Sequence, residues 1–204
     1  MPDLDLILRV FMPAFLIAYV LITYTTNVAA FKRRHGFDPR VTGPEDPVLY
    51  LCQIYRNAIV IGLFVIVSIY AASPALYKWL MPVRFLEIPA LRIVGMAAMI
   101  AGTFALRLAQ YQLGEAWRIG IDRSGTVTAL VTTGLYRRSR NPIALSMTMT
   151  VTGIFLALPN ALTLVVVLQT ILLFQVRVRI EEEHLTQLHG AAFEAYLQRT
   201  RRWI

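Results

Sequence analysis

Five apolar stretches constrain this chain more than any other feature of its sequence. They cover approximately residues 6–31, 50–72, 88–110, 142–158 and 161–175. A helix needs about 20 mostly apolar residues to cross the hydrocarbon core of a bilayer, and the first three stretches reach that length. The last two are shorter and are separated by Pro159-Asn160, a turn signal, so they predict a tight helical hairpin. We therefore predict an all-α integral membrane protein with about five transmembrane helices.

The composition agrees with this class of protein. Only 16% of the residues are charged, against about 25% in soluble domains. The net charge of +8 would suit nucleic acid binding, but the positive residues border the apolar stretches and do not form a stripe on a soluble face. The expected partner is therefore the lipid bilayer and not nucleic acid. Cys52 is the single cysteine, which excludes an intrachain disulfide and predicts a packed thiol.

Lysine and arginine concentrate in three of the segments outside the apolar stretches. Residues 32–48 hold four, residues 111–141 hold five and residues 177–204 hold five, whereas residues 73–87 hold two. Alternating spans place the three basic segments on one side of the membrane, and such an excess is typical of the cytoplasmic side. The sequence thus predicts an N-terminus outside and a cytoplasmic C-terminus. The small size favours a bacterial inner membrane.

Two arginines lie within the apolar stretches. Intramembrane charge is costly and usually marks a cavity or a partner. Arg107 is near the cytoplasmic end of its span, from which it can reach the interface. Arg56 lies deeper, and two alternatives stay open for it: an ion pair with a carboxylate, or a polar cavity. In the fourth span, Ser146, Thr148, Thr150 and Thr152 are expected to bond back to carbonyls of their own helix.

Two polar segments flank the predicted hairpin. Before it stands TTGLYRRSRNPI, residues 132–143, and after it RVRIEEEHLTQLHGAAFEAYLQRTRRWI, residues 177–204. The second segment alone could be a solvated, ion-paired helix end, since Arg177 and Glu181 lie four residues apart. Together the two segments supply arginines, carboxylates and aromatic rings, which suits a zwitterionic ligand with a cationic centre at the membrane face. His184 and His189 do not form a metal pattern, so no metal site is expected.

These motifs resemble the isoprenylcysteine carboxyl methyltransferase family, whose members are membrane enzymes related to phospholipid methyltransferases. The resemblance rests on LVTTGLYRRSRNP, an apolar hairpin and then RxRxEExxLxxxHGxxFxxYxxR, and it covers roughly residues 110–204. It implies three N-terminal helices in residues 1–110 and a catalytic region in residues 111–204. It also implies S-adenosylmethionine as the cofactor, in a cytoplasmic pocket around the last helical hairpin.

The chain departs from the family motifs at four positions. Asn141 stands where the family has His, Ala144 where it has Tyr, His189 where it has Phe, and Phe193 where it has Tyr. An asparagine still donates and accepts hydrogen bonds, so the cofactor framework is retained. The methyl acceptor is left open as a lipid-soluble or small molecule that presents a carboxylate, amine or thiol.

The resemblance implies a role for each motif residue. Glu182 is the candidate general base for an amine or thiol acceptor, and Arg199 would hold a carboxylate substrate. The residues expected to bind the cofactor are Leu130, Val131, Thr132, Gly134, Leu135, Tyr136, Arg140, Asn141, Pro142, Glu181 and Glu182. Those expected to bind the substrate are Trp117, Arg118, Tyr196 and Arg199.

Two other classes of function compete with this hypothesis. One is a membrane reductase on a related scaffold that uses NADPH, although such reductases usually have more spans. The other is a non-catalytic membrane protein. A transporter would be expected to show repeated halves with broken helices, and none is found in the sequence.

Overall fold

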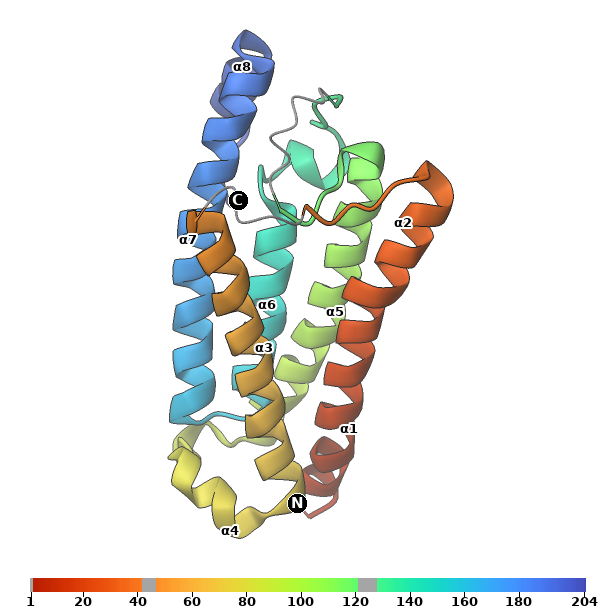
Figure 1. Ribbon diagram of the computed structural model, residues 1–204. Coiled ribbons are helices and arrows are strands. Elements are labelled where there is room, and N and C mark those ends of the chain that lie inside the picture. Colours follow the sequence, from red (N-terminus) through yellow and green to blue (C-terminus); the bar gives the residue numbers. More distant parts are fainter. Residues whose placement is uncertain (1, 42–46, 121–127) are drawn as a thin grey trace.

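The computed structural model describes residues 2–41, 47–120 and 128–204, and within them the chain is a bundle of helices (Figure 1). The only β pairings in these residues are two isolated bridges, Arg40 with Ile119 and Pro82 with Asn160. The long helical elements are α1 (Pro2–Val20), the π-helical segment η1 (Leu21–Thr26), α2 (Asn27–His35), α3 (Pro47–Ala72), α5 (Pro89–Leu113), α6 (Pro142–Ala157) and α7 (Ala161–His189). The short ones are α4 (Pro74–Tyr77), η2 (Lys78–Leu80), η3 (Arg84–Leu86), η4 (Gly114–Ala116), η5 (Gly134–Arg137) and α8 (Ala191–Arg199).

Four helical stretches are long and apolar enough to cross a membrane. They are Leu4–His35, Pro47–Ala72, Pro89–Ala116 and Ala161–His189. The fifth predicted span, α6, has 16 residues and is shorter than the others. The sequence prediction of about five spans is thus corrected to four long helices and one short helix packed among them.

Helix α7 is much longer than its apolar stretch. The apolar run ends near Gln175, but the helix continues to His189 because no glycine or proline interrupts it before Gly190. The polar residues after Gln175 therefore lie on the same continuous helix as the apolar residues before it. It begins with a capping box, in which the Asn160 side chain accepts from the Thr163 amide and the Thr163 side chain accepts from the Asn160 amide.

Successive long helices alternate in direction, so the loop after α2, the loop after α5 and helix α8 all lie at one end of the bundle (Figure 1). The N-terminus and α4 lie at the other end. The three segments that hold most of the basic residues therefore share one end. Arg123, one of those residues, lies outside the described part of the chain. That this end faces the cytoplasm stays a prediction.

Glycines let α5 and α6 pack closely. A Cβ atom on Gly95 would lie 2.6 Å from the Ala157 nitrogen, and one on Gly153 would lie 2.7 Å from the Gly95 oxygen. Small residues at a helix contact allow such an approach in membrane proteins. The predicted back-bonding in α6 is confirmed for three hydroxyls, since Ser146, Thr148 and Thr150 each donate to the carbonyl four residues earlier. The glycine contacts hold the end of α6 against the start of α5.

Candidate active site

A cavity of about 210 Å³ lies at the end of the bundle that carries the loops and α8. Residues from η1, α3, α5, α6, α7 and α8 line it, together with the segments 116–120 and 128–131. Its walls thus combine both predicted parts of the chain, residues 1–110 and 111–204. The cavity extends from the loop layer into the bundle, where apolar side chains such as Leu106, Met147 and Phe174 line it.

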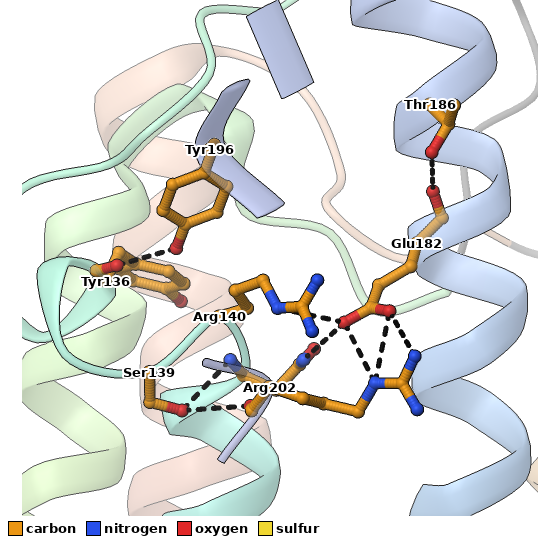
Figure 2. Close-up of polar contacts among 8 residues, drawn as sticks. Tyr136, Ser139, Arg140, Glu182, Thr186, Tyr196 and Arg202 are labelled. Carbon is orange, nitrogen blue, oxygen red and sulfur yellow. Dashed lines mark hydrogen bonds and ion pairs between the residues drawn. The ribbon is translucent and has the colours of Figure 1, made fainter. Parts of the chain in front are cut away.

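Glu182 of α7 is the centre of a polar cluster in the cavity wall (Figure 2). Arg202 donates to it through Nε and Nη2, at 3.1 and 2.7 Å from Oε2. The Arg140 guanidinium lies 3.5 Å from Oε1, and the Asn141 side-chain amide donates to the same oxygen at 3.3 Å. Glu182 is only 8% exposed, so its carboxylate has lost most of its contact with water, and these contacts compensate for that loss. Both oxygens of Glu182 are therefore engaged by the loop and the tail.

Backbone contacts strengthen the same connection. The Arg140 amide donates to the Arg201 carbonyl at 3.0 Å, and the Ser139 hydroxyl donates to the Arg202 carbonyl at 3.3 Å. The Asn141 amide donates to the Ser139 hydroxyl at 3.2 Å. The segment after α8 consequently lies along the residues that precede α6, and the two polar segments flanking the hairpin form one unit.

Tyr136 and Tyr196 connect α8 to η5 on the other side of this unit (Figure 2). The Tyr196 hydroxyl donates to the Tyr136 carbonyl at 2.6 Å, and the Tyr136 hydroxyl contacts the Ala109 carbonyl at 3.5 Å. Burial raises the pKa of Tyr196 to about 12 and raises the pKa of Tyr136 above its ordinary value. Both phenols are therefore neutral hydrogen-bond donors at any physiological pH.

The turn at Gly134 is held by α5. Gly134 has a φ of +61°, and a Cβ atom there would lie 2.5 Å from Oε1 of Gln112. The same oxygen accepts from the Leu135 amide at 2.8 Å. Only glycine satisfies both the left-handed backbone and this contact. Gly134 and Leu135 thus fix the loop against α5, and neither residue lines the cavity.

Glu181 differs from its two neighbours in the EEE run. It lines the cavity and has no ion pair or hydrogen bond with any residue that the structure describes. Arg177, one helical turn earlier, lines the same cavity. Glu182 is engaged as described above, and Glu183, exposed like Glu181, does not line the cavity. Of the three carboxylates, Glu181 is the one available to a ligand.

The structure brings most of the predicted site residues together. Those that line the cavity are Trp117, Arg118, Leu130, Val131, Tyr136, Arg140, Asn141, Pro142, Glu181, Glu182 and Tyr196. Thr132, Gly134 and Leu135 do not line it, although they belong to the same loop. Arg199 does not line it either and is exposed on α8, so its role in substrate binding stays a prediction.

Sequence reasoning missed three side chains of this region. Tyr24 lines the cavity from the π-helical segment, for which the sequence holds no evident signal. Arg177 was noted only as a possible partner of Glu181, and Arg202 only as part of a basic cluster. The two alternatives for Arg56 are now decided, because it lines the cavity and has no carboxylate partner among the described residues.

The fold and the site define a helical membrane protein with a polar cavity at one end of its bundle. The sequence model of the family described as phospholipid methyltransferase matches residues 90–192. The chain belongs to this family of membrane methyltransferases, and the resemblance found in the sequence is confirmed at that level. A comparison with curated proteins finds no match.

Proposed function

We propose that this protein is an integral membrane methyltransferase that uses S-adenosylmethionine and acts on a lipid-soluble or small acceptor at the cytoplasmic face. One observation carries the proposal. The cavity of a chain from a methyltransferase family contains an unpaired carboxylate, Glu181, beside arginine and asparagine side chains of the loop.

The donor groups around the cavity fit the chemistry of that cofactor. Glu181 would accept hydrogen bonds from its ammonium group. Arg140 would face its carboxylate, since Nε of Arg140 lies 3.5 Å from Glu182 Oε1 but makes no hydrogen bond with a described residue. Asn141 and the backbone at Leu130 and Val131 would hold the adenosine. Thr132, Gly134, Leu135 and Pro142 would shape the loop that carries these groups.

The bound cofactor would supply a methyl group on a sulfonium centre for in-line displacement. The chain's own residues would then mainly orient the reactants and exclude water. In this assignment Glu182 is a positioning residue, because taking up a proton would require it to leave Arg202. A carboxylate acceptor needs no general base, since it is ionised near neutral pH. The apolar part of the cavity would receive the acceptor from the bilayer.

Calorimetric titration of detergent-purified protein with S-adenosylhomocysteine tests the proposal. We expect binding in the micromolar range, and we expect Glu181→Gln to weaken it about tenfold because a charge-assisted hydrogen bond is lost. Glu183→Gln is the matched control, since Glu183 is an exposed glutamate of the same helix that does not line the cavity. Absence of binding by folded wild-type protein would overturn the proposal, and binding of NADPH in its place would favour a reductase.

A further inference from the structure

The membrane side of the cavity has a charge pattern that the cofactor does not explain. Arg56 of α3 and Arg177 of α7 both line it there, together with Tyr24 of η1. Arg177 is four residues before Glu181, which places it about 6 Å further from the loop layer along α7. Arg56 is nine residues after Pro47, or about 13 Å into α3.

The two guanidinium groups are not neutralised by the described part of the protein. The side-chain contacts of Arg56 are the adjacent Asn57 oxygen, at 3.2 and 3.4 Å, and the Tyr24 ring, 5.6 Å from its centroid. Arg177 has no ion pair or hydrogen bond with a described residue, although its charge interacts electrostatically with Glu181 one helical turn away. Both arginines act electrostatically on the Tyr24 hydroxyl, which itself has no hydrogen-bond partner among the described residues.

Tyr24 reaches this place from an unusual backbone. Residues Leu21–Thr26 form a π-helix between two α-helical parts of one long helix. Such π-helical turns are rare and frequently occur at functional sites. Thr23 and Tyr24 of this π-helical segment both line the cavity. The Thr23 hydroxyl donates to the Tyr19 carbonyl, whereas the Tyr24 hydroxyl has no hydrogen bond with a described residue.

Unpaired arginines at this depth are costly unless they meet an anion. The cofactor's own acidic group would face Arg140 at the loop end. A cofactor with a net positive charge would add to the positive charge already present around Arg56 and Arg177. The remaining ligand, the methyl acceptor, is therefore the one that would supply the negative charge.

We infer that Arg56, Arg177 and Tyr24 form an anion subsite that binds the phosphate or carboxylate group of a lipid acceptor. This inference rests on the proposed function. The planar guanidinium groups match such oxyanions in bidentate geometry, and the Tyr24 hydroxyl supplies a further donor. The acyl part of the acceptor extends from this subsite along Leu106, Met147 and Leu173 of the cavity wall.

Titrations with two short-chain lipids test the subsite. Dihexanoyl phosphatidic acid and uncharged dihexanoylglycerol are added separately to the full-length protein in a neutral maltoside detergent with S-adenosylhomocysteine present. We expect the anionic lipid to bind more tightly. Arg56→Gln and Arg177→Gln should each weaken its binding about tenfold, while the uncharged lipid is affected little.

Arg179→Gln is the matched control, because Arg179 is an exposed arginine of the same helix that does not line the cavity. Tyr24→Phe removes only the hydroxyl and serves if an arginine variant fails to fold. Equal affinity for the two lipids, or wild-type affinity in the folded variants, overturns the inference. It is also overturned if inorganic phosphate alone binds as tightly as the anionic lipid, since the ligand is then a soluble anion.

The proposed function and this inference fail separately. The wild-type titration with S-adenosylhomocysteine alone decides the first. If that ligand binds but the anionic lipid shows no preference, only the subsite is lost. If that ligand does not bind, the methyltransferase assignment is lost whatever the lipids do.

Discussion

Arg202 and Glu182 are joined by three hydrogen bonds: Nε donates to Oε1 and Oε2 at 3.2 and 3.1 Å, and Nη2 donates to Oε2 at 2.7 Å (Figure 2). The pair connects the segment after α8 to the middle of the polar part of α7. Arg140 and Asn141 also contact Oε1, so a single side chain holds together the loop, the helix and the tail.

Replacing Arg202 should therefore loosen the site without unfolding the bundle. Arg202→Gln leaves Glu182 with Arg140 and Asn141, and we expect a loss of about 1–2 kcal/mol of stability. The affinity for S-adenosylhomocysteine should fall about tenfold because the loop is less well held. Thermal unfolding and calorimetry measure the two effects. Arg201→Gln is the control, since Arg201 contributes only its backbone carbonyl to Arg140 and should behave as wild type.

The close contact between α5 and α6 predicts that a larger side chain at Gly153 lowers the stability of the bundle. Gly153→Ala places a methyl group 2.7 Å from the Gly95 carbonyl oxygen, a contact with backbone that cannot move aside easily. We expect a loss of about 2 kcal/mol, or roughly 4–8 °C in Tm. Gly62→Ala is the matched control, because a Cβ atom there has no neighbour within 4 Å and alanine is the better helix former. Equal Tm values for the two variants would contradict the close packing.

The start of α7 depends on Asn160. This residue is fully buried, its Oδ1 accepts from the Thr163 amide at 3.0 Å, and its Nδ2 donates to the Leu158 carbonyl at 3.0 Å. Asn160→Ala removes the cap and one buried donor, and should cost about 2 kcal/mol of stability. Asn160→Ser can still cap the helix and should recover part of the loss in the same thermal measurement. No difference between serine and alanine would argue against the cap.

Tyr196 predicts a dependence of stability on alkaline pH. Burial raises its pKa from 10 to about 12, so the folded state favours the neutral phenol. Its contribution is complete below pH 10 and is lost as the pH rises from 10 to 12. Tyr196→Phe should lower the stability by about 1 kcal/mol at pH 8, because the bond to the Tyr136 carbonyl is absent.

The comparison across pH isolates this residue from the other buried tyrosines. Between pH 10 and 12 the difference in Tm between wild type and Tyr196→Phe should shrink, because the wild type loses the stabilisation from the neutral Tyr196 hydroxyl, which the variant lacks. A difference that stays constant over that range would show that ionisation of the Tyr196 hydroxyl is not linked to the stability of the fold.

Apolar length, Pro159-Asn160 and the loop and tail motifs were enough to predict the helical class, the break before α7 and the loop side of the cavity wall, including Tyr136, Arg140 and Asn141. The sequence could not distinguish Glu181 from Glu182. Adjacent helical positions differ by about 100° in direction, so packing decides which carboxylate meets the cavity. It also could not place Arg202, because its contact depends on how the chain turns back at Gly190 and after α8.

The family match begins at residue 90, yet Tyr24 and Arg56 lie well before it and still line the cavity. Two of the three side chains assigned to the acceptor's charge therefore precede the family match, while the third, Arg177, lies within it on α7. Under the proposed assignment, exchanging the first two membrane helices would alter the acceptor's surroundings and leave the loop groups assigned to the methyl donor unchanged.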